Sequence, residues 1–158
     1  MRKVLTLILV FCIGLLATAY YMEYQMGLEP CPMCIVQRIA IALAGLAAFI
    51  GIIHNNFPKL YFSLTAFFSL SGGASAIRHL YLQSLPPDQI PSCGPDLNYL
   101  IENAYFSDAL VKLFIGDGNC AEVVWSLLGI SIPGWVLICA SAIFLVSLRQ
   151  LKVINPYG

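Results

Sequence analysis

The sequence is short of charge. Only 10% of its 158 residues are Asp, Glu, Lys or Arg, whereas about a quarter is usual in a soluble domain, and 59% are hydrophobic. It also lacks a block of basic residues, and its formal net charge at pH 7 is zero, which argues against nucleic-acid binding. The scarcity of charge therefore indicates a membrane protein.

Charge is entirely absent from three stretches that are long enough to cross a hydrocarbon core of about 30 Å. They are residues 4–22, 60–77 and 130–148. A fourth apolar stretch, 35–53, contains one charge, Arg38, near its start. Continuous apolar runs favour helices over barrel strands, which alternate apolar and polar residues. We expect an all-α membrane protein, a four-transmembrane-helix bundle in a single membrane domain over residues 1–158, with helices at about 4–22, 35–53, 60–79 and 130–149.

Basic residues predict the orientation of this bundle. They precede the first helix, lie in the second connection and follow the last helix: Arg2, Lys3, Lys59, Arg149 and Lys152. Basic segments of this kind stay in the cytoplasm, so both termini are expected there. A short first loop, about 23–34, and a long second loop, about 80–129, then face outward. A cleaved signal peptide is the alternative for the first helix, but its apolar run exceeds the usual signal core of about 7 to 15 residues.

Six cysteines are present, and they fall into two sets. Cys12 and Cys139 lie inside apolar stretches, where a cysteine is usually a small buried hydrophobe. The other four map to the outward loops, where disulfides persist: Cys31, Cys34, Cys93 and Cys120. Four cysteines allow three pairings and sequence alone does not choose among them, although we favour Cys31 with Cys34 and Cys93 with Cys120.

These two pairs differ in what a disulfide would do. A bridge between Cys93 and Cys120 would close a loop of about 27 residues and stabilise the fold by roughly 3 to 4 kcal/mol. A bridge between Cys31 and Cys34 would constrain almost nothing, but thiols in Cys-X-X-Cys motifs have tuned acidity and exchange readily. We therefore interpret the Cys31–Cys34 pair as catalytic.

Arg38 and His79 are further candidate site residues. Cys34 is expected in the first turn of the second helix, where the backbone N–H groups favour a thiolate. Arg38, four residues later, shares its face and carries a permanent positive charge. Ionisable residues in spans are functional candidates, although Arg38 could instead extend to the membrane interface. His79 is expected at the outer end of the third helix, where a lone histidine more often makes an interfacial hydrogen bond.

Three motifs resemble those of one family. They are EPCPMCIVQR at 29–38, RHLYLQ at 78–83 and GDGNCAEVVWSLLGISIPGW at 116–135, with Cys93 between the last two. The chain is similar in these motifs to the DsbB family, bacterial disulfide-generating proteins of the inner membrane. The resemblance implies an inner-membrane location, an active site facing the periplasm and cytoplasmic termini.

A disulfide relay is what the resemblance implies for the cysteines. A reduced periplasmic thioredoxin-fold dithiol oxidase, like DsbA, would attack Cys93, and Cys120 would be the disulfide mate of Cys93. The Cys31–Cys34 disulfide would then reoxidise this second pair.

The resemblance also implies a cofactor. Cys34 would face a membrane quinone, ubiquinone or menaquinone, with Arg38 stabilising the thiolate and polarising the quinone, and with His79 beside the ring. The chain would then be a protein-dithiol:quinone oxidoreductase. Gln37 stands where an acidic residue is common in the family, which leaves rate and redox potential open.

Three alternative functions remain to be considered. A vitamin K epoxide reductase-like enzyme has its quinone-facing Cys-X-X-Cys late in the chain, whereas here that motif comes first. Four outer cysteines could hold zinc, but only one Cys-X-X-Cys is present and such sites usually pair two couples, so no metal is expected. A bundle stapled by disulfides without catalysis would not require Arg38.

Overall fold

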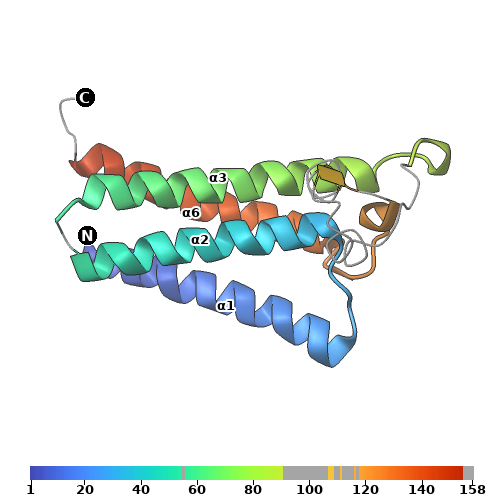
Figure 1. Cartoon of the computed structure of the whole chain (residues 1–158), viewed down its shortest axis with the longest axis horizontal. Coiled ribbons are helices and arrows are strands. Elements are labelled where there is room, and N and C mark those ends of the chain that lie inside the picture. Colours follow the sequence, from blue (N-terminus) through green and yellow to red (C-terminus); the bar gives the residue numbers. More distant parts are fainter. Residues whose placement is uncertain (55, 91–106, 109–110, 112–115, 117, 155–158) are drawn as a thin grey trace.

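The computed structural model describes residues 1–54, 56–90, 107–108, 111, 116 and 118–154. Within the described residues, four helices are each long and apolar enough to cross a membrane. They are α1 (Arg2–Met26), α2 (Pro32–His54), α3 (Pro58–Gln83) and α6 (Ile132–Ile154). The predicted all-α, four-helix membrane bundle is therefore confirmed (Figure 1).

Shorter elements lie between α3 and α6. They are the 3-10 helices η1 (Pro87–Gln89) and η2 (Gly118–Ala121) and the strands β1 (Ser126–Leu127) and β2 (Ile130–Ser131). The two strands pair antiparallel, and the turn between them has positive φ at Leu128 (55°) and Gly129 (78°). Positive φ at both central residues is the type I′ turn that suits a tight hairpin.

The helix bounds differ from the prediction by up to five residues, since α3 continues to Gln83 and α6 to Ile154. α1 continues to Met26, where Gly27 ends it in the left-handed conformation (φ 66°) that glycine adopts without steric cost. α2 begins at Pro32, a position that tolerates proline because its N–H would be unpaired. The first outer connection is therefore shorter than the expected 23–34. α6 begins two residues later than the expected 130, because the β2 residues pair with β1 instead.

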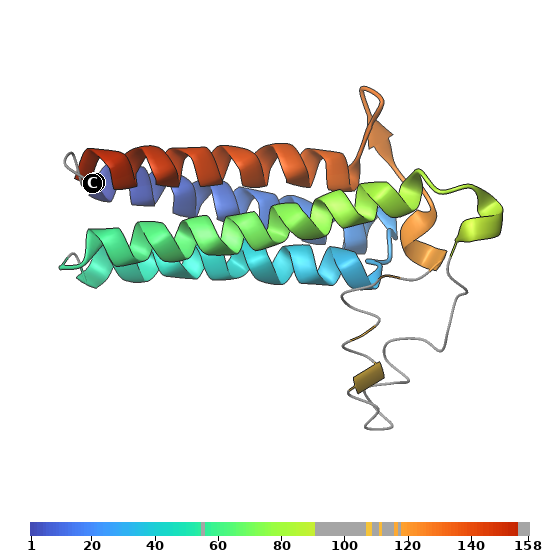
Figure 2. The ribbon, with the colours of Figure 1, turned by 90° about the horizontal axis from the view of Figure 1, so that it is seen from above.

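The helices pack in a simple order. α3 lies against both α2 and α6, and α1 lies against α2. The start of α1 and the end of α6 are at one end of the bundle, which we call the terminal end (Figure 1). The opposite end carries residues 27–34, η2 and the hairpin, and we call it the site end (Figure 2).

The core lies where small residues let the helices approach. Its buried members come from all four helices: Leu5, Ile8, Cys12, Ile41, Ala44, Ala48, Phe62 and Ile143. A Cβ on Gly45 would lie 3.1 Å from the Cβ of Cys12, so α1 and α2 are in close contact there. Cys12 is 1% exposed, in agreement with its expected role as a buried hydrophobe.

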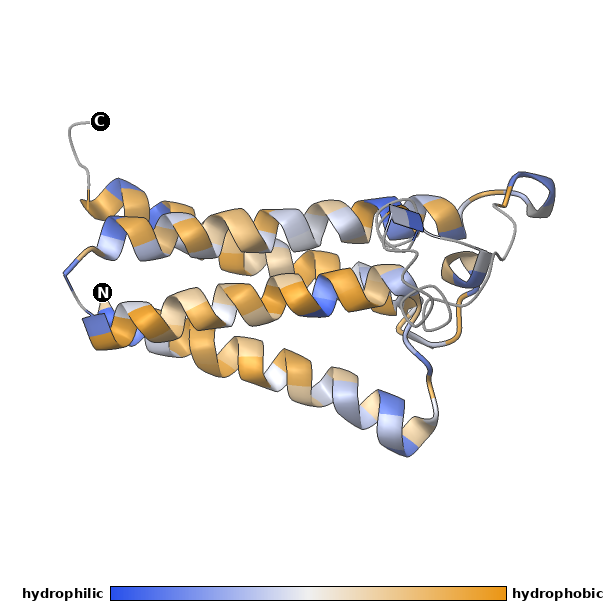
Figure 3. Cartoon of the chain, in the orientation of Figure 1, coloured by the Kyte–Doolittle hydropathy of each residue, from blue (hydrophilic) through white to orange (hydrophobic). Residues whose placement is uncertain are grey.

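The outer surface of the bundle is apolar along most of its length. Hydrophobic residues colour the middle of the helices, and hydrophilic residues gather toward their ends (Figure 3). Leu7, Phe67 and Leu145 are more than 60% exposed. Such a surface suits contact with lipid rather than water.

Candidate active site: a cysteine cluster beside an apolar cavity

The Cys-X-X-Cys motif forms the start of α2. The Cys31 carbonyl accepts the Ile35 N–H at 3.2 Å and so closes the first helical turn. The Sγ atoms of Cys31 and Cys34 are 3.2 Å apart, close enough for a thiol–thiol hydrogen bond. Cys34 thus lies in the first turn, among backbone N–H groups that have no partner within the helix. This is the environment that the sequence predicted for it.

Cys120 is held against this motif by apolar packing. It is fully buried and packs in a cluster with Met33 and Leu82. Gly116, just before η2, has φ 83°, and a Cβ there would lie 2.5 Å from Leu82 Cδ1 and 2.9 Å from Met33 Sδ. Glycine is therefore required at this position for the segment to lie this close to α2 and α3.

Gln83 ties two further segments to the end of α3. Its Oε1 accepts a hydrogen bond from the Ser131 hydroxyl at 2.8 Å, and its Nε2 donates to the Glu122 carbonyl at 3.5 Å. The residues that follow Cys120 and the strand before α6 are thereby fixed to one side chain. Gln83, the last residue of the RHLYLQ motif, therefore positions these two segments at the site end.

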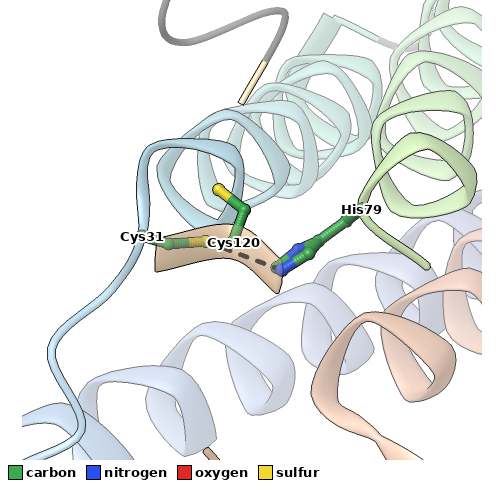
Figure 4. Close-up of side chains that lie close together, drawn as sticks. All are labelled: Cys31, His79 and Cys120. Carbon is green, nitrogen blue, oxygen red and sulfur yellow. Dashed lines mark hydrogen bonds between the residues drawn. The ribbon is translucent and has the colours of Figure 1, made fainter. Parts of the chain in front are cut away.

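His79 points from α3 toward the two cysteine-bearing segments (Figure 4). The Sγ atoms of Cys31 and Cys120 and a ring nitrogen of His79 all lie within 4.8 Å of one another, and His79 Nε2 is 3.7 Å from Cys31 Sγ. The other ring nitrogen, Nδ1, is 3.3 Å from Gln37 Nε2. With the amide donating to Nδ1, Nε2 carries the proton and directs it toward Cys31. His79 and Gln37 are both buried.

Arg38 reaches across to α1. Its guanidinium forms an ion pair with Glu23, donates through Nη2 to the Ala19 carbonyl at 3.1 Å and lies 5.2 Å from the centre of the Tyr20 ring. These contacts hold the guanidinium between α2 and the last turns of α1. Its charge is permanent but is partly balanced by the Glu23 carboxylate.

An apolar cavity of about 190 Å3 lies beside these residues. α1 and α6 contribute mainly apolar lining, including Leu15, Met22 and Val136. The polar lining comes largely from α2 and α3: Cys34, Gln37, Arg38, His79 and Gln83. A cavity of about 150 Å3 is enough to hold benzene. The cavity therefore fits a substituted six-membered ring, and its few N–H donors suit the two carbonyl oxygens of a quinone.

Five of the six predicted site residues come together here. They are Cys31, Cys34, Arg38, His79 and Cys120. Cys93 lies outside the described residues, so its pairing with Cys120 stays a prediction.

Two residues of the site were missed by sequence reasoning. Glu23 was assigned to the loop, whereas it lies in the last turn of α1 and pairs with Arg38. Gln37 was treated only as a departure from the family, whereas it contacts His79. A signal for Gln37 was present, since it and Arg38 are the only polar side chains in residues 35–53.

Comparisons with known proteins agree with the motifs. A family model described as "Disulfide bond formation protein DsbB" matches residues 1–150. A "Disulfide bond formation protein B" of Saccharophagus degradans is 44% identical over 152 residues, which are 94% of this chain and 92% of the relative. The protein of the same description from Hahella chejuensis is 48% identical over 130 residues, 79% of this chain and 78% of the relative. That from Marinobacter nauticus is 42% identical over 150 residues, 93% of this chain and 89% of the relative.

Proposed function

Because the chain belongs to the DsbB family of disulfide bond formation proteins, we propose that it reoxidises a periplasmic, DsbA-like thioredoxin-fold dithiol oxidase and passes the electrons to a membrane quinone. One observation carries this proposal. Cys34, Arg38 and His79 line a single apolar cavity, while the Cys31 sulfur lies within 4.8 Å of the Cys120 sulfur. A thiol pair thus has a partner sulfur on one side and room for a ring on the other.

The proposed membrane is the bacterial inner membrane, with the site end toward the periplasm. Support comes from the basic residues, which lie at the start of α1, at the start of α3 and in the last part of α6, all at the terminal end. Cytoplasmic loops carry such an excess of Lys and Arg. The cysteines of the site end would then lie in the oxidising compartment.

The first exchange within the chain is assigned to Cys120 and Cys31. The Cys120 thiolate attacks the Cys31 sulfur of the Cys31–Cys34 disulfide, forms a Cys31–Cys120 disulfide and releases Cys34 as a thiolate. The short distance between these sulfurs supports this order. Cys120 is the described cysteine of the second pair, and it lies beside Cys31.

The second exchange regenerates the outer pair. Cys93, freed from the periplasmic partner, attacks Cys120, so that the Cys93–Cys120 disulfide forms and Cys31 leaves as a thiolate. His79 is suited to stabilise that thiolate, because its Nε2 lies 3.7 Å from the Cys31 sulfur. The net result is a reduced Cys31–Cys34 pair, with two electrons and two protons to pass on.

A quinone in the cavity would accept these two electrons and two protons. For that step the chain holds Cys34 at a helix start, where a thiolate is favoured, and fixes the Arg38 cation on the same face. Apolar lining from α1 and α6 would keep water from the sulfur. Because these two helices make little direct contact, a ring could enter between them from the lipid.

The vitamin K epoxide reductase-like alternative is less well supported. Its quinone-facing Cys-X-X-Cys would come late in the chain, whereas here α2 carries the motif and α6 contributes Cys139 alone. The family match also covers this order of motifs.

Quinol formation tests the proposal directly. Full-length protein in detergent is mixed without oxygen with a reduced DsbA-type partner and ubiquinone or menaquinone, and quinol is followed by its ultraviolet absorbance. We expect quinol from the native chain, none from Cys34→Ser, and native rates from Cys12→Ala, whose cysteine lies in the core away from the site. Quinol formation by Cys34→Ser, or none by the native chain with either quinone, would refute the proposal.

A further inference from the structure

The reduced site has the geometry of a metal centre. Cys31, Cys120 and His79 each offer one ligand atom, and the three atoms lie within 4.8 Å of one another (Figure 4). We propose that the fully reduced chain binds one Zn²⁺ through these three residues, and that the metal holds the relay in its reduced, inactive form. The proposal goes beyond disulfide exchange and does not depend on a quinone.

The distances support a tetrahedral site. With Zn–S near 2.3 Å and Zn–N near 2.0–2.1 Å, tetrahedral ligands stand about 3.8 Å apart for two sulfurs and about 3.6 Å for a sulfur and a nitrogen. The Cys31 Sγ–His79 Nε2 distance is 3.7 Å. Little movement is needed to bring the third ligand, Cys120, to the same spacing.

Charge favours a divalent cation over a monovalent one. Two thiolates and a neutral imidazole around Zn²⁺ sum to zero net charge, whereas Cu⁺ in the same set would leave one negative charge. Cys120 and His79 are buried, and a net charge there would be costly. Binding would release two thiol protons and would involve no electron transfer.

The ligand form of His79 depends on Gln37. Zinc needs a lone pair on Nε2, so the ring proton must be on Nδ1 and must be accepted there. Rotating the Gln37 amide by about 180° presents Oε1 in place of Nε2, 3.3 Å from Nδ1, and provides that acceptor. The same side chain therefore suits both the proton-donating and the metal-binding tautomer.

The fourth coordination position has a nearby donor. An outside water could complete the tetrahedron without adding charge, whereas Cys34, whose Sγ is 3.2 Å from Cys31 Sγ, would add one negative charge if it bound as a thiolate. Spacing along the chain gave no sign of this centre, because its ligands come from the start of α2, the end of α3 and η2. A single Cys-X-X-Cys counts against zinc only where all four ligands are cysteines, and here His79 supplies one of them.

Oxidation and metal binding exclude each other at this site. A Cys31–Cys34 or Cys31–Cys120 disulfide removes a thiolate ligand. Zinc in turn would occupy the two sulfurs that the proposed exchange uses. The metal should therefore bind the reduced chain selectively and block its reoxidation.

Metal stoichiometry tests the inference apart from catalysis. Reduced and oxidised full-length protein are each incubated with Zn²⁺ without oxygen, desalted and analysed for zinc, and Cd²⁺ is used in parallel for its thiolate charge-transfer absorption. We expect one Zn²⁺ per reduced chain and none per oxidised chain. Cys120→Ser and His79→Ala should each weaken binding by at least about tenfold, while Cys12→Ala should bind as the native chain does.

Three results would overturn it. They are equal binding by the two redox forms, native affinity in both ligand variants, and loss of binding in Cys93→Ser, which would assign the metal to another set of thiols. These outcomes are independent of quinol formation. A native chain that makes quinol when metal-free but binds no zinc would refute this inference and leave the proposed function standing.

Discussion

At the terminal end of the bundle α1 lies close against α2, whereas toward the site end the two helices diverge (Figure 1). At the first end the contact is made by small and aliphatic residues, such as Gly51 against Leu5. At the second end it is made by a long polar pair, Arg38 with Glu23. The terminal end is therefore closely packed. At the site end the Arg38–Glu23 pair, here called the polar bridge, joins the two helices and leaves room for a cavity.

The residues that stabilise the fold and those that carry the proposed chemistry therefore lie mainly at opposite ends of the bundle. The described residues of the terminal end include His54, which contacts Tyr61 through Nδ1 at 2.7 Å, but none of the cysteines that line the cavity. The site end has fewer buried apolar side chains but contains the thiols, the cation and the imidazole. Substitutions at the two ends should accordingly affect different measurements.

Arg38→Met should have the largest effect of the substitutions that follow. It removes the fixed cation beside Cys34, and loss of a comparable charge-stabilising donor lowers turnover by about 10²- to 10³-fold. We expect a loss of about 10²-fold in quinone reduction, with helix content by circular dichroism unchanged.

Arg38→Lys is the matched control for this substitution. It keeps the charge but cannot reach the Glu23 carboxylate and the Ala19 carbonyl with one planar fork, so an intermediate rate is expected. Unchanged kinetic constants for Arg38→Met would show that the cation has no part in the reaction.

Gly51→Ala tests the close packing of the terminal end. The added Cβ would lie 2.9 Å from Cβ and Cγ of Tyr61 and 3.1 Å from Leu5, so the helices must shift. Overpacking of this kind costs about 1 to 3 kcal/mol, measured as the free energy of unfolding in mixed detergent. Quinone reduction at a temperature where the variant stays folded should be unaffected.

Gly14→Ala provides the comparison, because a Cβ on Gly14 meets nothing within 4 Å. We expect it to be neutral or slightly stabilising. If both alanine variants were equally stable, the close packing of α2 against α1 and α3 would not be what stabilises this end.

The sequence predicted what depends on local periodicity. Apolar runs placed four spans, and the helical repeat placed Cys34 and Arg38 on one face of α2. The sequence could not predict contacts between segments that are far apart along the chain. The approach of Cys120 to Cys31 depends on how Gly116 and Cys120 pack on Met33 and Leu82, and the Glu23–Arg38 pair depends on α1 extending beyond its apolar run.

Glu23→Gln should have the smallest effect, and its sign is informative. Glutamine keeps an oxygen that can accept from Arg38 but removes the charge that balances it. Partly exposed ion pairs are worth up to about 1 kcal/mol, so the stronger field should speed alkylation of Cys34 by a neutral reagent by up to about fivefold. Peptide mass spectrometry measures this rate, and Glu23→Asp, which keeps the charge, is the control. A slower rate in Glu23→Gln would mean that the carboxylate acts by anchoring the guanidinium, in which case the polar bridge matters for its geometry more than for its charge.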